Sequence, residues 1–263
     1  MTYPSWVVLH VPHDSTDVPH AVREQFLLND EQLAIELNRM TDHRTRALFV
    51  DQSSDAATVR APVSRLVVDV ERFASDDDEP MAARGMGAVY TLTSGLAPLR
   101  RELSSDEREA LMQAYYFPHH VRLEAAVAAS VERHGRCLVL GAHSFPDRPL
   151  PYERAAADAE RPDICIGTDS FHTSEALARA FVTAFRRAGW RVAVNEPFAG
   201  ALVPSDRFGR DRRVAAVMVE INRRLYLKAG GAEVLPEFAA IARQVRQCCD
   251  LAIASYALLD ARR

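Results

Sequence analysis

The sequence has no apolar run approaching the roughly 20 residues that a membrane-spanning helix requires. Its N-terminus lacks the basic segment followed by an apolar one that marks a secretory signal. It also lacks an excess of positive charge, because the formal net charge is -4 and the arginines are scattered among acids. We therefore expect a cytoplasmic protein that binds neither nucleic acid nor a membrane; its oligomeric state is left open.

Cysteine is scarce as well. There are four cysteines, with one adjacent pair and no C-x-x-C spacing, so neither a disulfide framework nor a thiolate zinc site is expected. The thiols expected to remain reduced are Cys137, Cys165, Cys248 and Cys249.

The apolar residues that are present form an α/β pattern. With 263 residues and 48% hydrophobic content, the chain can bury one substantial core, and we expect a single domain over residues 1–263. Short apolar runs alternate with longer amphipathic ones, which is typical of a sheet covered by helices on both faces. The expected strands are 6–11, 65–70, 137–142, 163–168, 191–195 and 215–222.

Amphipathic segments with polar caps or terminal glycines fill most of the gaps. Pro118 predicts a kink or break inside one of them. The expected helices are 29–49, 104–135, 173–189 and 236–263. Residues 74–110 and 144–162 fit neither pattern and are expected to be long loops, which often carry function.

Polar residues follow each expected strand. In an open α/β sheet, ligands bind outside the carboxyl ends of the strands, so these residues predict a site at that edge. They are His13 and Asp14, Glu71 and Arg72, His143 and Ser144, Thr168 and Asp169, Asn195, and Glu220.

Two histidines on different strands favour a divalent metal, because strand ends hold ligands rigidly and neutral imidazole suits zinc. A catalytic zinc needs a third protein ligand, which Asp42 or His43 would supply from the end of the first long helix. Glu220 would then accept a proton from the attacking water.

Each of these residues also has an ordinary structural interpretation. A histidine after a strand is often a turn or cap residue, and Asp42 would serve equally well as a backbone acceptor at a helix end. Glu220 would pair with Arg223 or Arg224, and Arg72 with Glu71 in a surface ion pair of little energetic value.

The segment "LHVPHDSTDVP" resembles the opening H-x-P-H-S-G/S-x-x-x-P of the N-formylglutamate amidohydrolase family. This family is similar to zinc carboxypeptidases and to the deacylases that act on N-succinyl and N-acetyl amino acids. The resemblance continues in order over roughly residues 7–228, through "MTDHRTRALF", "SRLVVDVERF", "YYFPHHVRL", "GAHSFP", "DICIGTD", "VNEPFAGALVP" and "VEINRRLYL".

This resemblance implies a phosphorylase/hydrolase-like three-layer α/β/α sandwich with a mixed central sheet and one zinc ion. It implies that His13 and His143 are histidine ligands, that Asp42 is the carboxylate ligand, and that Glu220 is the general base. The activity implied is hydrolysis of the amide of an N-acyl amino acid by metal-activated water, with N-formylglutamate as the leading substrate.

Substrate contacts are implied at three further positions. Arg72 matches the arginine of the family's D-x-N-R and would grip a substrate carboxylate with a two-pronged hydrogen bond. His120 and Asn195 would bond the substrate or the developing oxyanion, although both residue types also serve as ordinary caps.

The chain departs from the family pattern at three positions. Asp14 stands where serine is frequent, Glu71 replaces the asparagine of D-x-N-R, and Ala142 replaces an acid before the histidine of "HS". Asp14 would be a rival ligand or would support one, and Glu71 would repel an anionic substrate unless arginines balance it. The alternative is therefore a carboxylate-binding module without metal chemistry.

A serine hydrolase that uses Ser15 or Ser144 with His143 is a further alternative. The sequence has no G-x-S-x-G nucleophile elbow. In addition, a serine next to its histidine on one strand points to the opposite face of the sheet.

Overall fold

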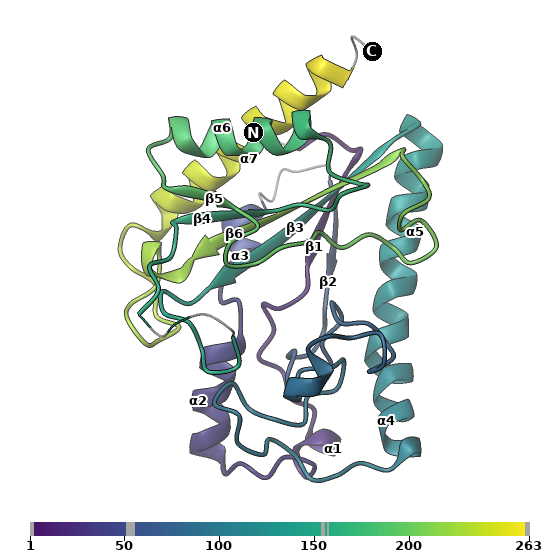
Figure 1. The fold of residues 1–263 in the computed structure, drawn as a ribbon, viewed down its shortest axis with the longest axis vertical. Coiled ribbons are helices and arrows are strands. Elements are labelled where there is room, and N and C mark those ends of the chain that lie inside the picture. Colours follow the sequence, from purple (N-terminus) through teal and green to yellow (C-terminus); the bar gives the residue numbers. More distant parts are fainter. Residues whose placement is uncertain (1–2, 51–55, 154–155, 157, 261–263) are drawn as a thin grey trace.

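The computed structural model describes residues 3–50, 56–153, 156 and 158–260 (Figure 1). Its centre is a six-stranded sheet in the order β2-β1-β3-β6-β4-β5. The strands are β1 Val7–Val11, β2 Ala57–Arg60, β3 Cys137–Phe145, β4 Ile164–Gly167, β5 Val192–Val194 and β6 Val214–Asn222. β2, β1, β3 and β6 are parallel, whereas β4 is antiparallel to β6 and parallel to β5, so the expected mixed sheet is confirmed.

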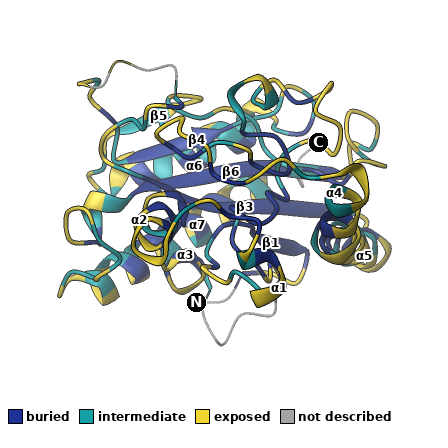
Figure 2. Cartoon of the chain, turned by 90° about the horizontal axis from the view of Figure 1, so that it is seen from below, coloured by how far each residue is buried: buried dark blue, intermediate teal, exposed yellow. Residues whose placement is uncertain are grey.

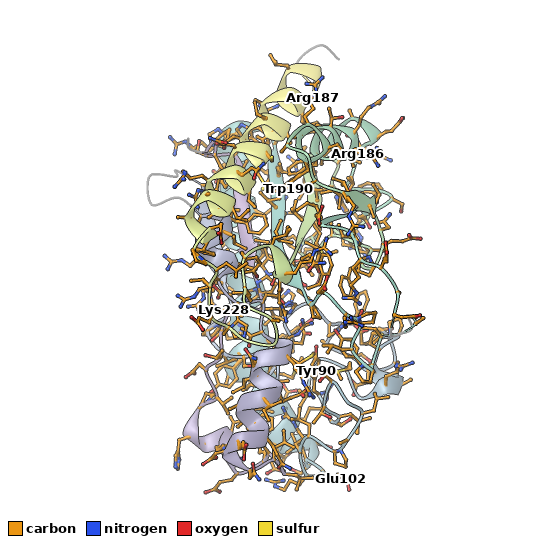
Figure 3. The ribbon with its side chains drawn as sticks, turned by 90° about the vertical axis from the view of Figure 1, so that its left-hand side faces the viewer. Tyr90, Glu102, Arg186, Arg187, Trp190 and Lys228 are labelled. Carbon is orange, nitrogen blue, oxygen red and sulfur yellow. The ribbon has the colours of Figure 1, made fainter. Side chains whose placement is uncertain are left out.

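Helices cover both faces of this sheet, as expected for an α/β/α sandwich (Figures 1 and 2). Because strand side chains alternate between faces, Val7 and Leu9 of β1 pack with α3, α6 and α7, whereas Val8 packs against α5. The helices are α1 His20–Arg23, α2 Asp30–Met40, α3 Thr45–Phe49, α4 Ser105–Leu111, α5 Phe117–His134, α6 Glu175–Arg187 and α7 Phe238–Asp260. Trp190, labelled in Figure 3, stacks on Phe185 of α6 with ring centroids 5.4 Å apart.

The expected helix 29–49 is two helices with a break at residues 41–44. A capping box at Asn29 starts α2, but Thr41 is extended and Arg44 has a φ of 65°. The amide of Asp42 then bonds the carbonyl of His13 at 2.8 Å. The break therefore places Asp42 beside the turn that follows β1.

The expected strand at residues 65–70 is wrong. This segment is a buried irregular stretch whose amides bond locally, Val67 and Val68 to the carbonyl of Ser64, and Asp69 to that of Ala88. Its apolar side chains pack into a second core with α2, α4 and residues 86–99 rather than into the sheet. The edge position belongs instead to β2, which has only one buried residue, Val59, and so lacks the apolar run that predicts a strand.

Pro118 does not break the helix that contains it. α4 continues through a π-helical turn, Met112–Tyr116, directly into α5, with Pro118 in the first turn of α5. A π turn tolerates the missing N–H of proline because the backbone pairing is already shifted there. This turn sets the direction of Tyr116, His119 and His120.

All four cysteines are buried free thiols, as expected. None of the helices in the described part of the chain is long and apolar enough to cross a lipid bilayer. Residues 154, 155 and 157 of the expected loop at 144–162, and residues 261–263 of the last expected helix, lie outside the described residues. The single domain and the cytoplasmic location stay predictions.

Leu123→Ala tests the packing of α5 against the sheet. Leu123 is fully buried, whereas Val121 of the same helix is 67% exposed. Removing the buried side chain is expected to lower the free energy of unfolding by about 2–5 kcal/mol. Val121→Ala is the matched control and is expected to change it by less than about 0.5 kcal/mol. Urea unfolding measures both, and equal effects would show that α5 does not pack as described.

Candidate active site

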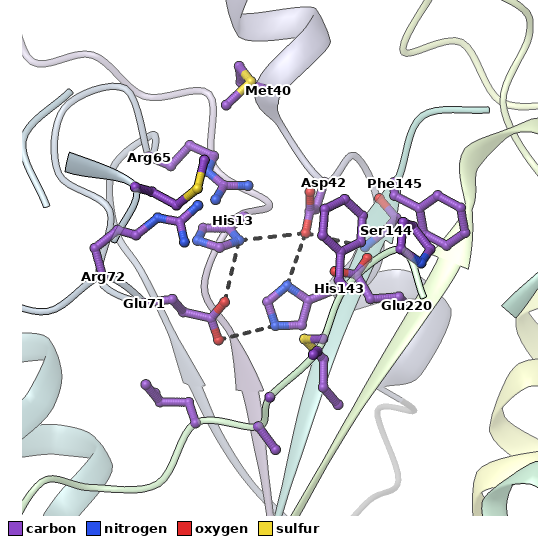
Figure 4. Close-up of a pocket in the computed structure, with 18 of the residues that line it drawn as sticks. His13, Met40, Asp42, Arg65, Glu71, Arg72, His143, Ser144, Phe145 and Glu220 are labelled. Atoms are coloured by element: carbon purple, nitrogen blue, oxygen red, sulfur yellow. Dashed lines mark hydrogen bonds and ion pairs between the residues drawn. The ribbon is translucent and has the colours of Figure 1, made fainter. Parts of the chain in front are cut away.

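A pocket of about 920 Å³ opens beside the carboxyl ends of β1, β3 and β6 (Figure 4). Its walls come from parts of three loops, at residues 71–81, 144–153 and 197–208, together with Tyr116 and His120 of the π turn and α5. Its floor carries His13, Glu71, His143 and Glu220. The pocket therefore lies where the sheet topology predicts a ligand site.

Three side chains on this floor form a compact group. One ligand atom from each of His13, Glu71 and His143 lies within 4.8 Å of the others. Nε2 of His143 is 3.2 Å from Oε1 of Glu71, and Nδ1 of His13 is 3.8 Å from its Oε2. The two imidazole centroids are 5.3 Å apart, so both rings face one space.

The two ring nitrogens that face Glu71 have no hydrogen-bond partner. Nδ1 of His13 and Nε2 of His143 are both buried and make no hydrogen bond within the described structure, although Nδ1 of His13 also lies 3.7 Å from Oδ2 of Asp42. A buried polar atom without a partner is costly, and two such atoms converging on one carboxylate suit a shared cation. Two imidazoles and one carboxylate are also a common donor set of catalytic zinc sites. These residues therefore fit a divalent metal.

The second nitrogen of each imidazole bonds a different carboxylate. Nε2 of His13 lies 2.8 Å from Oδ1 of Asp69, and Nδ1 of His143 lies 3.3 Å from Oδ2 of Asp42. Such pairs fix the tautomer and ring orientation of metal-binding histidines. In the neutral imidazoles each nitrogen that faces Glu71 therefore keeps a lone pair, which a cation is able to share with the carboxylate.

Asp42, expected as a metal ligand, lies at the site, where both of its carboxylate oxygens accept hydrogen bonds. Its Oδ1 accepts from Arg223 at 2.9 Å, and its Oδ2 accepts from the amide of Ser144 at 3.2 Å. The group with mutually close ligand atoms contains Glu71 and not Asp42. Glu71, expected from the family pattern to repel an anionic substrate, instead directs its carboxylate at both imidazoles.

The charges around this floor favour a cation between the imidazoles. Although burial opposes it, Glu71 and Asp42 hold the pKa of His143 well above its usual value. Although burial opposes it, the two histidines also hold the pKa of Asp42 below its usual range. Carboxylates and imidazoles that shift one another in this way are typical of functional sites.

Glu220 lies beside His143, since the two residues are register partners on β6 and β3. It is 7% exposed, lines the pocket, and its Oε2 is buried without a hydrogen-bond partner. Burial raises the pKa of Glu220 to about 7, and the nearby Asp42 and Glu71 add to the effect. A carboxyl with such a pKa is able both to accept and to return a proton near neutral pH.

Of the three residues expected to contact the substrate, Arg72 and His120 line the pocket and Asn195 does not. Arg72 lines the pocket, its Nε is buried without a hydrogen-bond partner, and its contacts to Asp69 and Glu79 are long, at 3.6 and 3.9 Å. His120 also lines the pocket, but its Nε2 is 2.9 Å from the carbonyl of Val70.

Asn195 does not line this pocket. It follows β5, which runs with β4 in the direction opposite to β6, so the end of β5 points away from the carboxyl ends of β3 and β6. Its side chain bonds the amide and hydroxyl of Thr168, both at 2.8 Å. This is the capping role that the sequence left open as the alternative.

Comparison with known proteins identifies the family. The model of the N-formylglutamate amidohydrolase family matches residues 5–227 of the 263. The chain belongs to the N-formylglutamate amidohydrolase family. Membership indicates an amidohydrolase with a small-molecule substrate. A search of curated proteins finds no match.

Solved structures of similar fold agree with this membership. The chain is similar to the crystal structure of an N-formylglutamate amidohydrolase from Ralstonia eutropha JMP134, with 21% identity, a TM-score of 0.81 and coverage of 98% of this chain and 95% of that one. It is also similar to the gene product Atu2144 of Agrobacterium tumefaciens, with 22% identity, a TM-score of 0.69 and coverage of 97% and 92%. At this identity the likeness shows the shared fold, which confirms the fold class.

The polar residues that supported the rival interpretations have partners other than His13, Glu71 and His143. Asp14 pairs with Arg60 and does not line the pocket, so it is no rival to the group around Glu71. Ser15 donates to the carbonyl of Pro62 at 3.0 Å, and the hydroxyl of Ser144 accepts from Arg223 at 3.2 Å. Neither hydroxyl is paired with His143, as a serine nucleophile requires.

Sequence reasoning missed Asp69, which is fully buried and joins the parts of the site. Its Oδ1 accepts from His13 and from the amide of Glu71, and its Oδ2 accepts from Arg65 at 2.7 Å and from Tyr90 at 2.5 Å. An acid inside the apolar run "RLVVDV" was the available signal. It was overlooked because the run was interpreted as a strand.

Asp69→Asn tests the structural importance of this carboxylate. It leaves the half-buried Arg65 without the fully buried carboxylate that balances its charge, and it is expected to lower the free energy of unfolding by about 3–5 kcal/mol. Asp30→Asn is the matched control, because Asp30 pairs with Arg23 while 95% exposed, and should cost less than about 1 kcal/mol. Urea unfolding distinguishes the two, and a small loss for Asp69→Asn would contradict the role given to it.

Proposed function

We propose that this protein is a zinc-dependent hydrolase that cleaves the amide of an N-acyl amino acid, with N-formylglutamate as the leading substrate. The observation that carries the proposal is the pair of unpaired imidazole nitrogens facing Glu71, next to a buried carboxyl at Glu220. His13, Glu71 and His143 would hold the ion, and Asp42 would orient His143. When bound, the ion would polarise the amide carbonyl and lower the pKa of a water molecule.

Glu220 supplies the proton transfers in this proposal. It accepts a proton as the water oxygen forms its bond to the carbonyl carbon, and it returns that proton to the amine nitrogen as the carbon–nitrogen bond breaks. Its burial and its pKa near 7 suit it to both steps. The products are a carboxylic acid and a free amino acid.

Arg72 would hold the carboxylate of the substrate. Three other arginines line the pocket, but Arg65 is engaged with Asp69 and Arg223 with Asp42, whereas Arg39 is exposed. Arg72 combines partial burial with long contacts only, at 3.6 Å to Asp69 and 3.9 Å to Glu79, and its Nε makes no hydrogen bond. A guanidinium that binds a carboxylate with two bonds also fixes the distance from the substrate to the floor of the pocket.

Glu220→Gln separates turnover from metal binding. The amide keeps the size of the side chain but accepts no proton, so hydrolysis of N-formylglutamate is expected to fall by about 10²-fold or more. The variant should still contain about one zinc per chain, because Glu220 is outside the proposed ligand group. Wild-type turnover in this variant would reject Glu220 as the base.

The wild-type protein provides the control for that experiment. It should purify with about one zinc per chain, lose activity with a chelator and regain it when zinc is added back. A chain that hydrolyses none of the formyl, acetyl and succinyl derivatives of Glu, Asp and Gln, but binds carboxylic acids without metal, would instead be the binding module. The same screen identifies the acyl group and the amino acid.

Arg72→Lys tests recognition of the carboxylate. Lysine keeps the positive charge but not the planar two-pronged donor, so KM is expected to rise by about tenfold with a smaller change in kcat. An amide-blocked substrate without the free carboxylate should show no such difference between the two proteins. Arg39→Lys, on the exposed rim, is the matched control and should leave KM within about twofold.

A further inference from the structure

Two buried histidines lie behind Glu71, on the side away from the pocket. His10 and His119 have exposures of 0%, and neither lines the pocket. Nδ1 of His10 is 3.3 Å from Oε1 of Glu71, and Nε2 of His10 is 2.9 Å from Nε2 of His119. Both contacts come from side chains that the reaction outlined above does not use.

The fold explains why these residues meet. Strand alternation places His10 on the same face of β1 as Val8, which is the face that α5 covers. His119 lies in the first turn of α5, immediately after the π turn, and therefore points at this end of β1. The imidazole centroids are 5.1 Å apart.

We propose that His10, with its hydrogen positioned by His119, orients the carboxylate of Glu71 as a metal ligand. His10 is thus a positioning residue for the metal site, and the inference rests on the proposed function. It adds a third imidazole to the site, one that contacts the carboxylate ligand and not the ion.

The hydrogen positions follow from the donors and acceptors available. Nδ1 of His10, like the two ring nitrogens in the pocket, is buried and makes no full hydrogen bond, so its 3.3 Å contact with Oε1 of Glu71 is an ion-pair contact. Because an ionised carboxylate only accepts, this nitrogen must carry the hydrogen that faces Glu71. Nε2 of His10 is then an acceptor, and since a single hydrogen fits between two nitrogens 2.9 Å apart, Nε2 of His119 must donate it. This order leaves Nδ1 of His119 without a hydrogen, and that atom is buried with no partner in the described structure.

Glu71 depends on this contact because its carboxylate has few others. Among the described residues, its ion-pair contacts are with His10, His13 and His143. The last two face it through the nitrogens that would hold the ion. His10 is therefore the contact able to fix the carboxylate independently of the metal, as supporting groups do in other metal sites.

The test measures zinc affinity by competition between the metal-stripped protein and a chromophoric chelator. His10→Leu removes the donor and is expected to weaken zinc binding by about 10–100-fold. His10→Asn places an amide N–H near the position of Nδ1 and should restore most of that affinity. Wild-type affinity in His10→Leu would overturn the inference, as would equal losses in both variants.

His172→Leu is the matched control for the loss of a buried histidine. His172 is 3% exposed, does not itself line the pocket, and bonds the carbonyl of Val214 and the amide of Gly209. This variant should lose thermal stability while keeping wild-type zinc affinity. A change in zinc affinity equal to that of His10→Leu would show that lost packing, and not orientation of Glu71, is responsible.

A second variant covers the case in which His10→Leu does not fold. His119→Leu removes the donor that sets the hydrogen of His10 and is expected to weaken zinc binding by about threefold or more. Unchanged affinity there would also overturn the inference. A wild-type protein that binds no zinc would instead reject the proposed function itself, so the two failures are distinguishable.

Discussion

The site depends on one buried carboxylate, that of Asp69. Removing a carboxylate from water costs several kcal/mol, and only a full set of donors offsets that cost. Asp69 has such a set, since it accepts from Arg65, Tyr90, His13 and the amide of Glu71. Because two of these donors belong to the candidate metal group, the interaction that neutralises the charge also fixes the geometry of the site.

On the floor of the pocket, the imidazoles of His13 and His143 alternate with the carboxylates of Glu71 and Asp42. The dashed contacts in Figure 4 join both His13 and His143 to Glu71 and to Asp42, and the far side of His13 contacts Asp69. His13 and His143 thus each have a carboxylate, Asp69 and Asp42 respectively, on the nitrogen that does not face Glu71. This alternation makes a cation between the imidazoles favourable and leaves the buried Glu220 as the separate acid and base.

The sequence predicted most strands of the sheet and several residues of the site. Apolar runs predicted five of the six strands; four of them, β1, β3, β4 and β6, are almost entirely buried, as a sheet covered on both faces requires. His13, His143 and Glu220 were predicted because they follow or end such strands, and the structure brings them together in one pocket. Asn195 was expected at the pocket but does not line it. An apolar run does not reveal the direction of a strand, and β5 runs opposite to β6.

What the sequence determined by itself is therefore local: which segments are strands or helices, and which polar residues stand at their ends. Tertiary structure decided what no local pattern contains. The run "RLVVDV" is buried in a second core and not in the sheet, which turns Asp69 and Glu71 toward His13. His10 and His119 are 109 residues apart, and only the packing of α5 on β1 makes them neighbours. The physical reason is that burial and ion pairing between distant segments depend on how the layers pack, and propensity and periodicity report only on the nearest residues.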